Sequence, residues 1–94
     1  MRESQIEKHL VKRVKELGGE VRKVNWVNRR GAPDRLAMFR PTGASRFRLP
    51  IWIELKATDK PAEPHQLREH ARMRAMGQRV VIIDSIEGIE ELLK

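Results

Sequence analysis

The fold is decided by residues 51–60, which read IWIELKATDK. Their alternation predicts a β-strand, because successive side chains of a strand point to opposite faces of the sheet. The face expected in the core is apolar: Ile51, Ile53 and Leu55. The other face is mostly polar: Trp52, Glu54 and Lys56. It therefore carries a carboxylate and an ammonium group about 6.5–7 Å apart along the strand.

This polar face has two interpretations. One is the exposed face of an antiparallel sheet, where polar and apolar residues commonly alternate. The other is a functional site, and the sequence GAPD at residues 31–34 favours it. Asp34 follows Gly31 and Pro33 and precedes a second expected strand, so its carboxylate can converge on Glu54 of the neighbouring strand. Taken alone, Asp34 is also an ordinary turn residue.

Two carboxylates that converge on one point repel each other unless a cation lies between them. Ligation by oxygen atoms alone suits Mg²⁺ or Mn²⁺ better than Zn²⁺. Lys56 would then stand beside the metal, where it orients a water molecule or neutralises charge that develops on a phosphate group. The functional interpretation is thus a divalent metal site for phosphate chemistry.

The rest of the chain supplies the elements of a single α/β domain over residues 1–94. The first helix is expected at residues 3–19, with Ser4 and Glu7 as its capping box. Its apolar stripe contains five residues: Ile6, Leu10, Val11, Val14 and Leu17.

The remaining elements follow from periodicity and from turn residues. Three strands are expected first, at 20–27, 35–39 and 49–57, with the turn 28–34 between the first two and the polar loop 40–48 between the last two. A helix at 65–76 follows Pro64, and a strand at 79–83 and a helix at 84–94 complete the chain. The composition of the strand at 79–83 predicts that it is fully buried. Three consecutive strands and a helical crossover to a fourth indicate a mixed four-stranded sheet flanked by helices.

The composition points to a polyanionic partner. The chain of 94 residues has a net charge of +7, and its two Trp, two Phe and absent Tyr argue against base stacking as the main mode of binding. Contact with phosphates is expected, and a generic basic surface that maintains solubility is the alternative. The chain has no Cys, which excludes disulfides, thiolate metal sites and a cysteine nucleophile. Without a long apolar run or a signal-peptide pattern, a soluble intracellular protein is expected.

These motifs resemble the PD-(D/E)xK nuclease superfamily, and within it the stand-alone VRR-NUC domain of phages and bacteria. The resemblance rests on four features: the N-terminal helix with Glu7, GAPD at 31–34, WIELKA at 52–57, and HQLREH at 65–70, where a Gln is followed four residues later by a His. It covers nearly the whole chain. It implies a restriction-endonuclease-like α-β-β-β-α-β core and a nuclease activity.

The resemblance also implies roles for individual residues. Asp34 and Glu54 would hold Mg²⁺ or Mn²⁺, with the backbone carbonyl of Leu55 as a further ligand. Lys56 would be the catalytic lysine, and Gln66 an additional polar residue near the site.

Glu7 corresponds to the helix-borne acid of the family, which can hold the metal through water or occupy a second metal site. Because Glu7 would also complete a capping box with Ser4, the two roles compete for one side chain. Glu3 is the alternative acid if the helix begins earlier.

Other chemistries find less support. His65 and His70 lack the paired spacing of a histidine metal site, and His70, one helical turn after Gln66, is expected to pack behind the site. The serines have no nucleophile motif around them. Six basic residues would contact phosphates at a nuclease site and are otherwise solvated surface charges. They are Arg29, Arg30, Arg35, Lys60, Arg68 and Arg72.

We therefore expect a metal-dependent DNA endonuclease that hydrolyses phosphodiester bonds. The stand-alone members that the chain resembles imply a homodimer acting on branched DNA such as Holliday junctions, and a two-fold dimer presents two active sites to two strands. The alternatives are a nicking or restriction-like nuclease on plain duplex DNA and a non-catalytic DNA-binding module, although the latter has no reason to keep a repulsive acid pair. The expected location is the cytoplasm of a bacterial or phage-infected host cell.

Overall fold

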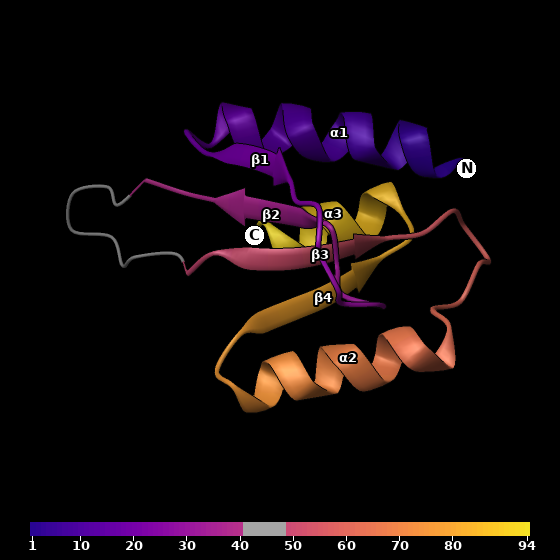
Figure 1. Cartoon of the computed structure of the whole chain (residues 1–94). Coiled ribbons are helices and arrows are strands. Elements are labelled where there is room, and N and C mark those ends of the chain that lie inside the picture. Colours follow the sequence, from indigo (N-terminus) through magenta and orange to yellow (C-terminus); the bar gives the residue numbers. More distant parts are fainter. Residues whose placement is uncertain (41–48) are drawn as a thin grey trace.

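The elements of the protein follow the order that the sequence predicts, as a computed structural model shows for residues 1–40 and 49–94 (Figure 1). They are α1 (Glu3–Glu16), β1 (Glu20–Lys23), β2 (Arg35–Met38), β3 (Ile51–Leu55), α2 (Pro64–Ala75), β4 (Arg79–Ile83) and α3 (Ile86–Leu92). The α/β class is thus confirmed. Of the loop expected at 40–48, residues 41–48 lie outside the described part of the chain.

The sheet is mixed, with the strand order β1-β2-β3-β4. β2 pairs antiparallel with both β1 and β3, whereas β3 and β4 are parallel. Parallel neighbours need a crossover connection, and α2 provides it between β3 and β4. This arrangement is the mixed four-stranded sheet expected from the sequence.

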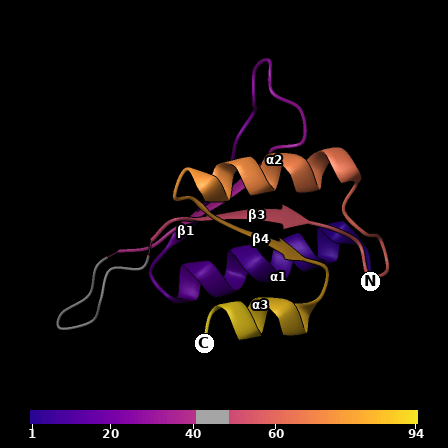
Figure 2. The same cartoon turned by 90° about the horizontal axis from the view of Figure 1, so that it is seen from below.

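Helices cover both faces of the sheet: α2 lies on one face, and α1 and α3 lie on the other (Figure 2). The apolar core fills the space between the sheet and the pair α1 and α3. As predicted, Ile51, Ile53 and Leu55 on the core face of β3 belong to it. The other buried members of the core are Ile6, Leu10, Val14, Ala37, Ile83, Ile89 and Leu93. No helix in the described part of the chain is long and apolar enough to cross a membrane.

The layer between the sheet and α2 is different in character. It buries charged and polar side chains, namely Glu54 on β3 and Glu69 and His70 on α2. Since carboxylates are almost never buried without partners, this layer is where function is expected.

The N-cap of the first helix lies two residues before the expected cap, Ser4. Its N-cap is Arg2, whose backbone N–H donates to the side chain of Gln5 at 2.9 Å. The predicted capping box of Ser4 and Glu7 is therefore wrong, because Gln5 performs that role, and the carboxylate of Glu7 is free for other contacts. The predicted stripe was also too wide, since Val11 and Leu17 are 43% and 39% exposed.

Two strand predictions also need correction. β4 was expected to be fully buried, but it lies at the edge of the sheet among the described strands, and Ile82 is 38% exposed. β1 ends at Lys23 instead of Val27, because the chain leaves the sheet in a loop at residues 24–34. A backbone hydrogen bond of 2.9 Å from Val24 N to Asp34 O closes this loop, which rises past α2 in Figure 2.

Gly31 fits this loop against the start of α2. Its φ of +87° is left-handed, and an added Cβ would lie 2.9 Å from the carbonyl oxygen of His65 and 3.2 Å from Cα of Gln66. Only glycine meets both conditions without strain. The close approach places Asp34, three residues later, near the helix that carries Gln66.

Replacing Gly31 tests this packing. Gly31→Ala and Gly77→Ala should each lose about 1–2 kcal/mol of unfolding free energy, because both positions have positive φ. Gly31→Ala should lose at least about 1 kcal/mol more, since only its Cβ meets neighbouring atoms. Urea denaturation measures the difference, and equal losses in the two variants would contradict the close packing.

Candidate active site

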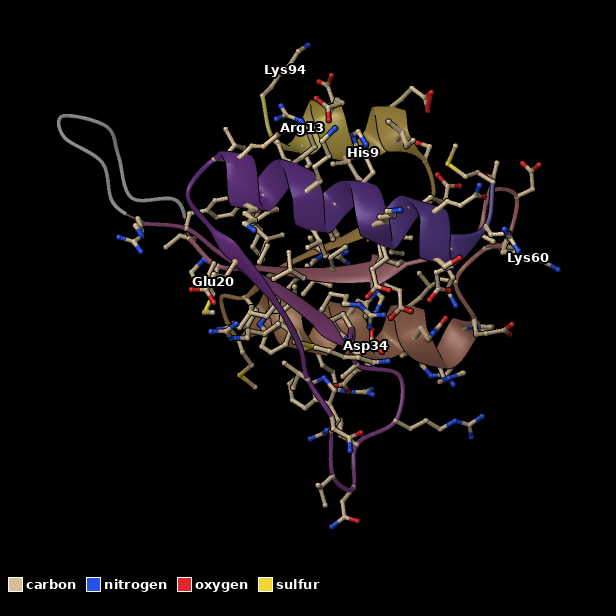
Figure 3. The ribbon with its side chains drawn as sticks, turned by 90° about the horizontal axis from the view of Figure 1, so that it is seen from above. His9, Arg13, Glu20, Asp34, Lys60 and Lys94 are labelled. Carbon is tan, nitrogen blue, oxygen red and sulfur yellow. The ribbon has the colours of Figure 1, made fainter. Side chains whose placement is uncertain are left out.

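The register of the sheet brings the two predicted carboxylates together. Arg35 pairs with Ile53 across β2 and β3, so Asp34 comes alongside Glu54 at the next position of the antiparallel pair. In Figure 3, Asp34 lies where the 24–34 loop returns to the sheet. The convergence expected from GAPD and IELK is present in the fold.

Glu54 is the buried centre of the site. Its residue is 9% exposed, and its carboxylate lies 3.9 Å from Lys56 Nζ, 3.3 Å from Gln66 Nε2 and 3.5 Å from His70 Nε2. Burial raises the pKa of Glu54 to about 7, and the charges of Asp34 and Glu3 add to this effect against the opposing charges of Lys56 and Arg35. The favourable contacts thus compensate only part of the cost of burying this carboxylate.

α2 contributes two side chains to the same point. Gln66 donates a hydrogen bond from Nε2 to Glu54, while its Oε1 accepts one of 2.8 Å from Glu63 N at the start of the helix. The amide is therefore held from both ends. His70 has no exposed surface, and burial lowers its pKa, so the ring favours its neutral form. The structure thus brings both residues of the Gln and His pattern to Glu54.

On the opposite face of the sheet from Glu54, Arg35 joins two acids from different segments of the chain. It is 6% exposed, its Nε donates to the carboxylate of Glu7, and its Nη1 lies 2.7 Å from Asp34 Oδ1. The sequence suggested Arg35 as a phosphate contact, but here its guanidinium is buried and engaged by two carboxylates.

Two acids of α1, Glu3 and Glu7, thus act at the site. Glu7 is in contact with Arg35, and the charge of Glu3 acts on Glu54. The two lie one turn apart on α1 and share a face of the helix. The sequence left both as candidates, and both lie on the side of the helix that faces the site.

The donor set fits a hard divalent ion. Within the described residues, no three side chains of His, Asp or Glu surround a common point. Asp34 and Glu54 are nevertheless oxygen donors of the kind that Mg²⁺ prefers, and Mg²⁺ is commonly held by only one or two carboxylates while it keeps several waters. The incompletely compensated charge of Glu54 is what such a cation would offset.

The remaining predicted phosphate contacts lie on the surface. Arg30, Lys60 and Arg68 are exposed, and Figure 3 places Lys60 on the outer part of the loop that leads to α2. Arg29 and Arg72 are also exposed, but both are paired with Glu69 Oε1, at 3.5 and 2.8 Å. A hollow of about 610 Å³ opens beside Asp34, with Lys23 and Arg29 in its lining.

Sequence reasoning missed Glu69 and the partnership of Trp26 with Trp52. The two rings are tilted by 48° with centroids 5.1 Å apart. Trp26 was expected in a strand, and no local pattern pairs residues of the 24–34 loop with β3. The only sequence signal for Glu69 is that it follows Gln66 by three residues on the same expected helix. Many surface acids have such a spacing, so it does not single out Glu69.

The proteins to which this chain is similar include a curated protein and a solved structure. The chain is 45% identical over 85 residues to "Putative nuclease p44" of Acyrthosiphon pisum secondary endosymbiont phage 1, covering 90% of this chain and 85% of that protein. It also matches the solved structure of a VRR_NUC domain with 35% identity and a TM-score of 0.80, over 97% of this chain and 92% of that one. The chain belongs to the VRR-NUC family. No model in a scan of protein families matches it.

Membership of the VRR-NUC family confirms the resemblance seen in the motifs. In this VRR-NUC domain, three of the residues quoted for that resemblance, Lys56, Gln66 and His70, lie within 3.9 Å of the Glu54 carboxylate. A fourth, Asp34, comes alongside Glu54 through the register of β2 and β3.

The raised pKa of Glu54 predicts how the stability of this VRR-NUC domain depends on pH. An acid whose pKa is higher in the folded state destabilises the fold once pH rises above its ordinary value of 4.5, and the penalty is complete above about 7. In EDTA at pH 8, Glu54→Gln should therefore stabilise the protein by about 2 kcal/mol, and the gain should vanish near pH 4.5.

Thermal or urea unfolding between pH 4.5 and 8 measures this dependence. Glu20→Gln, which changes an exposed acid on β1, is the matched control and should show little dependence on pH. A gain from Glu54→Gln that is the same at both ends of the range would contradict the buried, charged carboxylate.

Proposed function

We propose that this VRR-NUC domain is a divalent-metal-dependent DNA endonuclease that hydrolyses phosphodiester bonds. The observation that carries the proposal is the convergence of Asp34 and Glu54 from two strands, with Lys56 3.9 Å from Glu54. The relatives support a nuclease, and the net charge of +7 supports a polyanionic substrate.

Asp34, Glu54 and the carbonyl of Leu55 would hold Mg²⁺ or Mn²⁺. When bound, such an ion supplies a Lewis acid that polarises the phosphodiester and lowers the pKa of a water molecule. The chain's own part is to keep Glu54 in place, which Gln66 does through its hydrogen bond of 3.3 Å. His70 fills the space behind the carboxylate and excludes water from it.

Lys56 supplies a fixed positive charge. It is on the same face of the sheet as Glu54, and its side chain is 17% exposed, so the ammonium is partly shielded from solvent. In this setting it stabilises negative charge on the phosphate more strongly than a fully solvated lysine would.

Arg35 acts in this proposal as a positioning residue. It ties the Asp34 carboxylate to Glu7 of α1 and keeps the acids from repelling one another before a cation arrives. Glu7 would hold the ion through water, with Glu3 as the nearby alternative on the same helix. The exposed residues Arg30, Lys60 and Arg68 would contact phosphates around the site.

The proposed substrate is branched DNA such as a Holliday junction, cut by a homodimer in the cytoplasm of a bacterial or phage-infected host cell. A single chain of 94 residues has little surface beyond its catalytic face, whereas a two-fold dimer presents two sites to two strands.

Substitution of the acids tests the catalytic proposal. Asp34→Ala and Glu54→Ala should reduce Mg²⁺- or Mn²⁺-dependent cleavage to background, because each removes a ligand, while DNA binding stays equal or becomes tighter. Lys56→Ala should lower kcat by about 10²–10³-fold. Gln66→Ala, which acts through Glu54, should lower activity by about 10–100-fold.

Cleavage of a labelled plasmid or oligonucleotide measures these effects, with Glu20→Ala as the matched control for loss of an exposed acid. EDTA should stop cleavage by the parent protein. If both acid variants cut as well as the parent, the proposed site is wrong; if no form cuts and all bind DNA, the domain is a binding module.

Substrate choice and assembly are tested together. A four-way junction should be cut at least about tenfold faster than a linear duplex of the same sequence, and light scattering should give twice the chain mass of 11.0 kDa. Equal rates on both DNAs would favour a nicking or restriction-like nuclease instead. A solution mass of one chain would exclude the dimer.

A further inference from the structure

A second hollow lies on the same face of the sheet as the proposed active site. It has a volume of about 310 Å³, at the small end of the range for ligand pockets of roughly 300–1,000 Å³. Its walls are aromatic and apolar, with Trp26, Trp52, Met73 and Met76 among its lining residues, and Arg29 and Arg72 are its basic members. The proposed cleavage reaction does not use any of these side chains.

The two indole rings are held in place by their own hydrogen bonds. Trp26 Nε1 donates to the carbonyl oxygen of Pro33 at 2.8 Å, and Trp52 Nε1 donates to Gln78 Oε1 at 3.0 Å. With both N–H groups satisfied within the protein, the apolar parts of the two rings remain to line the hollow. Rings fixed in this way lose little freedom when a flat ligand stacks on them.

Three observations place the hollow next to the proposed catalytic residues. Trp52 precedes Glu54 by two residues on the same face of β3, which is about 6.5–7 Å along the strand. Trp26 bonds to Pro33, the residue before Asp34. Trp26 and Arg29 also line the larger hollow that contains Asp34. A single nucleotide, from its phosphate to its base, can span the distance between the two places.

The charges of the hollow favour a neutral flat group inside it and phosphates outside it. Glu69, with a side chain that is 5% exposed, anchors both arginines through Oε1. Its carboxylate would repel a phosphate that entered the hollow. The arginine side chains are 54% and 57% exposed, so they can reach phosphates at the mouth of the hollow.

We propose that this hollow binds an unpaired nucleobase of the DNA next to the scissile phosphate. The proposal rests on the nuclease function above and names its substrate class, DNA with an unstacked nucleotide at the cleavage site. Stacking on an aromatic ring accepts any base, because every base has a π-face. In an intact duplex the same base must first be unstacked and unpaired, which costs free energy and disfavours that substrate.

The chain contains its own probe for this site. Its two Trp both line the hollow, and it has no Tyr, so tryptophan emission reports on this site. In EDTA, a duplex with a single-stranded flap should quench the emission, and a fully paired duplex of the same sequence should quench it at least about fivefold less at equal concentration. Equal quenching by the two DNAs would overturn the proposal.

Two variants separate the site from the fold. Trp52→Leu should weaken binding of the flap DNA about 5- to 150-fold and change duplex binding little, since stacking is lost only where a base is unpaired. Met76→Glu adds a charge at a side chain that is 81% exposed and therefore preserves the fold, and it should weaken flap binding selectively. Ala71→Glu, on an exposed position of α2 outside the hollow, is the matched control.

The results distinguish this proposal from the proposed function, because binding in EDTA needs no cleavage. Selective quenching without any cleavage in Mg²⁺ or Mn²⁺ would support the base site and overturn the nuclease proposal. Cleavage of flap and duplex DNA at equal rates, unchanged by Trp52→Leu, would support the nuclease proposal and overturn the base site. If Met76→Glu instead changes the mass measured by light scattering and leaves DNA selectivity intact, the hollow is an interface between copies and the base site is wrong.

Discussion

The burial of the Glu54 carboxylate is the constraint on which the catalytic side of this domain depends. A carboxylate between a sheet and a helix is unfavourable unless it is hydrogen-bonded or paired. Gln66, His70 and Lys56 gather around it from α2 and β3, and still its pKa rises to about 7. α2 is therefore not an ordinary apolar cover, and the apolar core lies on the opposite face with α1 and α3. This incomplete compensation is the physical basis on which we propose a cation at this place.

The same side of the sheet is linked to the core through Arg35. This residue belongs to β2, is buried, and contacts both Glu7 of α1 and Asp34 at the beginning of the strand. The position of α1 thus affects the position of a proposed metal ligand. Buried ion pairs contribute little net stability, but losing one partner leaves a charge uncompensated, so the arrangement favours one geometry for the acids.

Much of the site could be read from local pattern. Alternation in β3 placed Glu54 and Lys56 on one face, and GAPD placed Asp34 at the start of the next strand in the sheet. Other expectations failed for identifiable reasons. Gln5 replaced Glu7 in the helix cap because the helix begins earlier, and β4 is exposed at Ile82 because composition does not reveal which strand lies at an edge. The net charge and the small number of aromatic residues predicted contacts with phosphates. They did not predict that the two Trp side chains meet beside the site.

The sequence by itself determined the order of the elements, the two faces of β3 and the acids and lysine of the candidate site, because these follow from the local periodicity of strands and helices and from turn residues. Only the tertiary structure decided that Arg35 is engaged by Glu7 and Asp34, that α2 brings Gln66 and His70 to Glu54, and that Trp26 meets Trp52. These pairings join segments distant in the chain. They depend on strand register and on how the 24–34 loop and α2 pack against the sheet, which no local pattern specifies.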